Sequence, residues 1–286
     1  MIPAAFDYVR VSSVDEAIQA LSQHGEEAKV LAGGHSLIPL LRLRLAYPSA
    51  LVDVGRVDEM RGVREDGDHL VIGSATTHDE VMNNDFVKQR CGIVAETLSH
   101  VGDPQVRHRG TFGGGLAHGD AAGDLPALAL ALDADFVVQG PGGRRTVAAS
   151  DFFVDYLQTA LAPDDVLVEV RVPKLGAGWG YNYQKFNRVA QAWAIVGSCA
   201  LIRRDNGTIG EARIGLSNMA MTPIRATATE QGLAGASPDA VADACDRAAD
   251  GTNPPEDLNA RADYRQHLAR VLTRRAVEHA LGATGT

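Results

Sequence analysis

The sequence has few of the residues from which proteins build metal centres. Its 286 residues include three cysteines, Cys91, Cys199 and Cys245, and no C-x-x-C pair. An iron-sulfur cluster normally takes four thiolates in closer groups, and the nine histidines include no H-E-x-x-H zinc motif. Any redox chemistry therefore requires an organic cofactor or a partner chain. The three cysteines are expected to be reduced and buried.

Positive charge and long apolar runs are also scarce. Lys and Arg total 27 against 36 Asp and Glu, a formal net charge of −9, whereas nucleic-acid binding needs a surplus of positive charge. No run approaches the ~20 apolar residues of a membrane-spanning helix. The first residues, M-I-P-A-A-F-D-Y, do not form a signal peptide. We therefore expect a cytoplasmic protein that has no transmembrane segment and does not bind nucleic acid.

Glycine is concentrated in two stretches whose composition indicates ligand-binding loops. In the first, A-G-G-H-S-L-I-P (32–39), a short apolar run ends in Gly33 and Gly34 just before a new apolar segment. Without Cβ atoms, the consecutive N–H groups of such a loop can converge on an anion. Ser36 would cap the following helix or donate to a phosphate oxygen. An ordinary turn is the alternative to this phosphate cradle.

The second stretch, R-H-R-G-T-F-G-G-G-L-A-H-G-D-A-A-G-D-L-P (107–126), contains six glycines. So many glycines are costly in chain entropy, and close approach of the backbone to a ligand explains them better than a structural role alone. Neither stretch carries the G-x-G-x-x-G or Gly-Lys-Ser/Thr pattern of the common nucleotide loops. One diphosphate ligand shared by both loops is therefore predicted.

Three groups of polar residues leave alternatives open. Asp120 and Asp124 would act as an acid/base pair, or, as we prefer, close a turn and bind ligand hydroxyls. In Y-N-Y-Q-K-F-N-R (181–188), Tyr183 and Lys185 would stack on and neutralise a flat heterocycle, or simply share one face of an amphipathic edge strand. His35 and His118 are assigned no catalytic role, because a histidine beside a phosphate loop is more often a structural donor.

The apolar periodicity predicts a mixture of helices and strands. The linker L-G-A-G-W-G (175–180) would separate a domain at 1–176 from a domain at 177–286. Arginines at 261, 265, 270, 274 and 275 predict a solvated basic helix face, with a docking surface for an acidic partner as the alternative. Strands are expected at 6–11, 50–54, 69–73, 135–148 (a hairpin), 166–172 (half-buried) and 194–216 (a hairpin), and helices at 14–25, from about 36 to 48, from about 79, and at 93–101, 125–132, 239–249 and 258–281.

The two glycine motifs and Y-Q-K-F (183–186) resemble those of the FAD-binding medium subunits of molybdenum hydroxylases, in particular the branch found in aerobic carbon monoxide dehydrogenases. The likeness covers essentially the whole chain and includes I-G-L-S-N-M-A-M-T-P-I-R-A (214–226). It implies an α+β protein with a vanillyl-alcohol-oxidase-type FAD fold of two α/β subdomains that divide near residues 55–60, followed by a C-terminal α+β domain with an antiparallel sheet. Relatives often have Asp where Ala192 stands, and Ser or Asn where Gly115 stands.

The resemblance also implies the FAD site, with no catalytic residue and no metal on this chain. Ala32 to Ser36 and Thr111 to Gly115 would hold the diphosphate and adjoining parts of FAD. Asp124 would meet the ribityl chain, and Lys185 would lie near the isoalloxazine. The implied cofactor-binding residues are Ala32, Gly33, Gly34, His35, Ser36, Leu37, Val101, Gly102, Thr111, Gly113, Gly114, Gly115, Asp124, Leu167, Tyr183 and Lys185.

Family membership further implies partner chains. A large molybdenum subunit would oxidise the substrate, and a small subunit with two [2Fe-2S] clusters would pass electrons to the FAD and on to an external acceptor such as a quinone. The expected assembly is a heterotrimer doubled into a hexamer, associated with a membrane only through partners. The alternatives are the same subunit in a purine or N-heterocycle hydroxylase, a flavin-free binding or assembly module, and a self-sufficient flavin oxidase.

Overall fold

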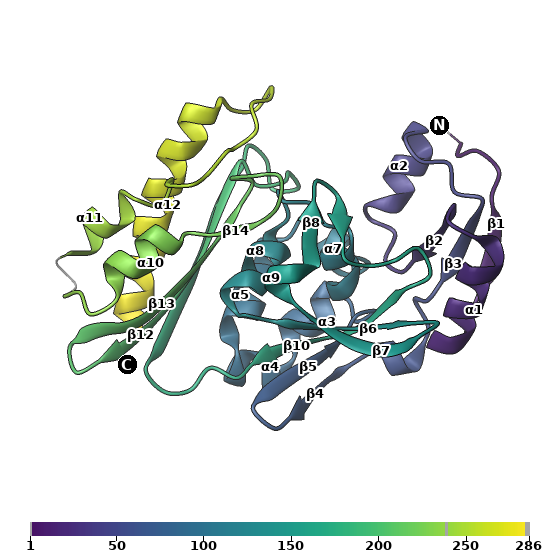
Figure 1. Cartoon of the computed structure of the whole chain (residues 1–286), viewed down its shortest axis with the longest axis horizontal. Helices are drawn as coiled ribbons and strands as arrows, with labels where there is room; N and C mark the ends of the chain where they lie inside the picture. The colour runs from purple at the N-terminus through teal and green to yellow at the C-terminus, as the bar shows by residue number, and fades with distance from the viewer. Residues whose placement is uncertain (1, 238–239, 284–286) are drawn as a thin grey trace.

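The computed structural model describes residues 2–237 and 240–283 and places them in three main sheets with helices packed between and around them (Figure 1). The predicted α+β fold class is confirmed: one small sheet is parallel and the two larger sheets are antiparallel. The order of elements along the chain places the parallel sheet first and the long C-terminal helix last.

The first sheet has the order β1-β3-β2, with all strands parallel. Its strands are β1 (Asp7–Arg10), β2 (Ala28–Leu31) and β3 (Ala50–Asp53), connected by α1 (Val14–His24) and α2 (Leu37–Leu43). As predicted, α1 begins where the Ser13 side chain accepts the N–H of Glu16 and ends at Gly25. The expected continuation of α2 to Pro48 is wrong, because Arg44 takes a left-handed conformation with φ 58°.

The second sheet has the order β4-β5-β10-β6-β7 and is antiparallel. Thr77 and Glu80 form the predicted capping box at the start of the first helix that follows β5. The strands are β4 (Val63–Asp66), β5 (His69–Gly73), β6 (Asp135–Gly140), β7 (Gly143–Ala148) and β10 (Val166–Pro173); the accompanying elements are η1 (Asp58–Met60), α3 (His78–Asn83), α4 (Asp85–Arg90), α5 (Gly92–Ser99), α6 (Pro104–Arg107), α7 (Phe112–Ala117), α8 (Asp124–Ala131), α9 (Ala149–Phe152), β8 (Phe153–Asp155) and β9 (Gln158–Thr159).

Strand β10 is buried on both faces, which corrects the prediction of a half-buried strand. Val166 and Val168 pack into the core around α1 and the first sheet. Leu167 and Val170 point the other way, into the large core shared with α5 and α8. Side chains of β10 do point alternately to the two faces of the sheet. However, a second core covers the face that the prediction left exposed to water.

The third sheet has the order β11-β12-β13-β14 and is antiparallel. Its strands are β11 (Trp179–Phe186), β12 (Val196–Asp205), β13 (Thr208–Ser217) and β14 (Ile224–Arg225), and its helices are α10 (Thr227–Leu233), α11 (Val241–Cys245) and α12 (Ala262–Ala283). Helix α12 covers one face, while α8 and α5 contact the sheet from the other side (Figure 1). Every residue of α8 is buried, which explains why all of them except Asp124 are apolar.

Two predicted helices begin or end elsewhere. The last helix starts at Ala262 rather than Leu258, because the Asp257 side chain accepts the N–H groups of Asn259 and Ala260 and holds them in a turn. The helix expected at 239–249 is described only as α11, Val241–Cys245, after which the chain continues in tight turns. Asp239 lies outside the described residues.

Candidate functional site

The two glycine stretches meet at one cleft of about 620 Å³. The loop between β2 and α2 forms one wall, and the segment leading into α7 forms the facing wall. Further lining residues come from the start of α8, from Lys185 and from the 101–102, 159–165 and 191–193 segments. We call this space the glycine-loop cleft. The sequence separates its two main walls by more than 70 residues, and the fold brings them together.

Gly33 is the point at which the two loops touch. A Cβ atom added to Gly33 would overlap the carbonyl oxygen of Arg109 and crowd the Cα atom of Gly110. A larger residue at this position would therefore force the loops apart. The cleft depends on this close backbone approach, as the hypothesis of a shared diphosphate ligand requires.

Thr111 and Gly113 organise the second loop. The Thr111 side chain caps α7 by accepting the N–H of Gly114 at 3.2 Å. Gly113 packs against Ser74, where an added Cβ would clash, and its N–H donates to the Ser74 carbonyl. By contrast, the Ser36 side chain makes no capping bond to α2, so of the two predicted roles of Ser36 only the ligand-facing one remains open.

Most of the residues expected to bind a cofactor line the glycine-loop cleft, but three do not. Gly113 faces Ser74, Leu167 lies in the core beneath the cleft, and Tyr183 is buried behind Asp124. Those that line the cleft are Ala32, Gly33, Gly34, His35, Ser36, Leu37, Val101, Gly102, Thr111, Gly114, Gly115, Asp124 and Lys185.

Asp124 anchors a buried polar cluster at one end of the cleft. Its Oδ2 lies 2.9 Å from Lys185 Nζ, and its Oδ1 accepts a 2.6 Å bond from the Tyr183 hydroxyl. Tyr183 and Lys185 thus share one face of β11, as their spacing predicted. Burial raises the pKa of Asp124, although the Lys185 cation and the two donors oppose that shift. Burial beside this carboxylate also raises the pKa of Tyr183 well above its ordinary value.

Glu96 on α5 holds β11 in place for this cluster. Its Oε1 accepts a 2.8 Å bond from the Tyr183 backbone N–H and a 2.7 Å bond from Asn182. Lys185 Nζ also donates to the carbonyl of His100, just after α5. Tyr183 and Lys185 are therefore hydrogen-bonded to α5 and the residue that follows it, as well as to Asp124.

His78, the first residue of α3, also lines the cleft, although it is not among the residues predicted to bind a cofactor. Its side chain is buried against Gly110 and Gly115, and its Nδ1 has no hydrogen-bond partner among the residues that the structure describes. Burial, with smaller contributions from His35 and Arg107, lowers the pKa of His78 to about 4. The T-T-H sequence signals the helix cap but not this burial, which depends on loops from elsewhere in the chain.

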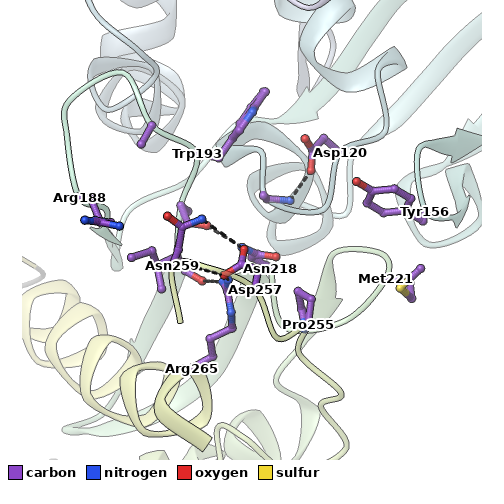
Figure 2. Close-up of a pocket in the computed structure, with 14 residues that line it drawn as sticks. Asp120, Tyr156, Arg188, Trp193, Asn218, Met221, Pro255, Asp257, Asn259 and Arg265 are labelled. Carbon is purple, nitrogen blue, oxygen red and sulfur yellow. Dashed lines mark hydrogen bonds and ion pairs between the residues drawn. The ribbon is translucent and has the colours of Figure 1, made fainter. Parts of the chain in front are cut away.

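A second cavity of about 560 Å³ adjoins the cleft and shares Ala192 and Trp193 with it (Figure 2). Asp120 lies in its wall and closes a turn by accepting the N–H of Ala122, so the turn interpretation of Asp120 is confirmed. Arg265 reaches the cavity from α12, fully buried, and pairs with Asp257 at 2.7 Å. The prediction of a solvated basic helix face is therefore wrong for Arg265.

The cysteines lie in the cores. Cys91, Cys199 and Cys245 are free and buried, as predicted, and burial raises the pKa of Cys91 to about 12. Within residues 2–237 and 240–283, no cluster of three or more His, Cys, Asp or Glu side chains is arranged to hold a metal ion. Over the same residues, none of the helices has the length and apolarity needed to cross a membrane.

Comparison with known proteins agrees with this architecture. Residues 4–175 match the family model "FAD binding domain in molybdopterin dehydrogenase", and residues 181–280 match "CO dehydrogenase flavoprotein C-terminal domain". The carbon monoxide dehydrogenase medium chain of Hydrogenophaga pseudoflava is 42% identical over 98% of both chains.

Solved structures match along the whole chain as well. Carbon monoxide dehydrogenase from Hydrogenophaga pseudoflava superposes with a TM-score of 0.96 at 43% identity, over 99% of both chains. Quinoline 2-oxidoreductase from Pseudomonas putida 86 superposes with a TM-score of 0.94 at 33% identity, over 99% of this chain and 100% of that one. The chain therefore belongs to the family of FAD-binding medium subunits of molybdenum hydroxylases, which includes the carbon monoxide dehydrogenase medium chains.

Proposed function

We propose that this chain is the FAD-carrying electron-transfer subunit of a carbon monoxide dehydrogenase. The observation that carries the proposal is the contact of the two glycine loops at Gly33 and Arg109, which creates a backbone-lined cleft with a buried Lys185–Asp124 pair at one end. The match to carbon monoxide dehydrogenase medium chains along the whole length supports the same assignment.

The residues of the cleft fit FAD. A diphosphate needs converging backbone donors without Cβ atoms in the way, which the segments around Gly33 and Gly114 supply. Within the described residues the Ser36 hydroxyl makes no capping bond, so it can donate to the ligand. Leu37, Leu40 and Val101 would provide apolar walls for flat rings, and Asp124 and Lys185, which also line the cleft, would meet polar groups of the bound molecule. When bound, FAD supplies the centre that takes up and releases electrons.

The partners follow from this proposal. The chain would receive electrons from the [2Fe-2S] clusters of a small subunit, while a large molybdenum subunit oxidises the substrate. An external acceptor such as a quinone would then remove the electrons from the FAD. We propose a heterotrimer that doubles into a hexamer in the cytoplasm and meets a membrane only through partners. Medium chains of multi-subunit dehydrogenases among the relatives support the existence of these partner chains.

We also propose that the chain divides into a flavin-binding part, 1–176, and a C-terminal part, 177–286, with a subdivision of the first part near 55–60. The separate three-stranded, five-stranded and four-stranded sheets support this division. The linker between β10 and β11, which contains Gly176 and Gly178, supports the main boundary.

The test is an absorption spectrum of the complex purified with its co-expressed partner chains, followed by acid release of the chromophore. We expect FAD, together with iron and molybdenum on the co-purifying chains. Carbon monoxide should bleach the flavin only when both partners are present. A colourless chain that joins the complex and takes up no added FAD would contradict the proposal and favour the flavin-free assembly module.

A second candidate is the same subunit in an N-heterocycle hydroxylase, which the match to quinoline 2-oxidoreductase favours. Both candidates require the same cleft, because the substrate is oxidised on another chain. Bleaching by quinoline and not by carbon monoxide would replace the first candidate with the second.

A further inference from the structure

Helix α2 exposes apolar side chains to an unusual degree. It has seven residues, of which only Leu41 is buried. Ile38 and Leu43 are 43% and 60% exposed, and just beyond the helix Leu45 and Tyr47 are 69% and 63% exposed. A helix this short is marginal in isolation and depends on packing. Much of its apolar surface nevertheless lies open in the single chain.

The neighbouring helix α1 shows the ordinary arrangement. Its buried face carries Ala17 and Leu21, and its exposed face carries Asp15, Glu16 and Gln19. The same small domain therefore separates apolar from polar side chains where a helix faces water. Exposed apolar surface beyond scattered single residues marks an interaction site, and α2 with the following turn gathers four exposed large apolar side chains between Ile38 and Tyr47.

The charge of this segment opposes that of the whole chain. Residues 37–47 contain Arg42 and Arg44 and no carboxylate, in a chain with a formal net charge of −9. Both arginine side chains are exposed, and neither forms an ion pair within the described residues. We define the α2 surface as the exposed side chains of this segment. They are Ile38, Arg42, Leu43, Arg44, Leu45 and Tyr47.

The α2 surface lies next to the glycine-loop cleft. Leu37 and Leu40 of the same helix line the cleft, so one side of α2 borders it. The helix lies beside the N-terminus (Figure 1). A protein that covers this surface would hold the helix against the cleft.

We propose that the α2 surface is the docking site for a partner subunit that presents carboxylates around an apolar face. The inference rests on the proposed function, because such a subunit exists only if the chain works within a multi-subunit complex. A second copy of this chain fits less well, since a two-fold contact would bring like-charged arginines together. An anionic membrane also fits less well, because two turns of helix offer little area for insertion.

The test uses the chain co-expressed with its two partner subunits. Leu43→Asp and the double variant Arg42→Glu/Arg44→Glu should each weaken binding to the partner subunits at least tenfold. Leu45→Asp should also weaken binding. Because Leu45 lies outside the helix, this loss cannot result from a lower helix propensity of α2. Matched controls are Phe86→Asp and Lys88→Glu on exposed positions of α4, which should bind within twofold of wild type. Affinity is measured by titrating each flavin-loaded variant onto the isolated partner pair.

Unchanged affinity of the two Asp variants and the arginine variant would overturn the proposal. So would a wild-type chain that is dimeric alone and becomes monomeric on Leu43→Asp, which assigns the surface to a second copy. Binding of the chain to phosphatidylglycerol vesicles, lost in the arginine variant while assembly is normal, would assign it to a membrane. The flavin spectrum distinguishes failure of this proposal from failure of the proposed function. If only the docking proposal fails, the wild-type complex still shows a normal flavin spectrum. If the proposed function fails, the wild-type complex contains no FAD.

Discussion

Lys185 on β11 and Asp124 at the start of α8 form an ion pair whose side chains are only 3% and 2% exposed. The pair joins the C-terminal sheet to α8, the helix that begins at the end of the second glycine stretch. A buried pair of this kind is sensitive to loss of one partner, because the remaining charge has neither water nor a counter-ion.

Lys185→Ala is expected to lower the free energy of unfolding by about 3–5 kcal/mol, since it leaves Asp124 buried and unpaired. If Lys185 lies near the flavin ring, the variant also shifts the midpoint potential of the bound flavin. Urea unfolding and a redox titration measure the two effects. Lys174→Ala, which removes a more exposed pair with Glu65, should change stability much less. An unchanged potential would place Lys185 away from the ring.

Gly33→Ala is expected to reduce FAD occupancy strongly. The new Cβ would push the Arg109 carbonyl away and separate the loops, and each charge-assisted bond lost to the diphosphate is worth about 1.5–3 kcal/mol, or tenfold or more in affinity. Gly176→Ala is the matched control, because no atom of the described residues lies within 4 Å of its added Cβ and its φ is ordinary. Wild-type occupancy in Gly33→Ala, measured from the flavin absorbance per chain, would contradict the cradle.

The buried His78 predicts a loss of stability in mild acid. Its pKa falls from 6.5 to about 4 on folding, so between these values the unfolded chain binds a proton that the folded chain does not. Stability is therefore full above about pH 6.5 and declines as the pH falls toward 4, by about 2 kcal/mol between pH 7 and pH 5. Urea titrations at several pH values measure this slope. His78→Gln should flatten it, whereas the exposed His267→Gln should leave it intact; equal slopes in all three proteins would refute the assignment.

Arg265→Leu is expected to destabilise the C-terminal part of the chain. Arg265 donates to the buried carbonyl of Ile195, a charge-assisted bond worth about 1.5–3 kcal/mol. Its pair with Asp257 adds less, because the Asp257 side chain is 42% exposed and water screens it. The exposed Arg261→Leu is the control. Thermal unfolding of the two variants should separate them clearly; equal melting temperatures would mean that the buried arginine contributes no net stability.

Local features of this protein could be predicted from the sequence because they depend on a few neighbouring residues. Ser13 before α1 and the Thr77–Glu80 capping box satisfy N–H groups within one turn. The glycine loops can be recognised from composition, because a residue without a Cβ atom lets another backbone segment or a ligand approach closely. The scarcity of cysteine clusters already pointed to an organic cofactor or a partner chain.

What the tertiary structure decided is which side chains lose contact with water. The double burial of β10, the burial of Arg265 in an apparently solvated helix and the burial of His78 in the cleft wall all depend on segments distant in the sequence. The exposure of Leu43 on an apolar helix has the same origin. The apolar periodicity of a sequence shows on which face of a helix or strand a residue lies. Only the packing of the whole fold determines what covers that face.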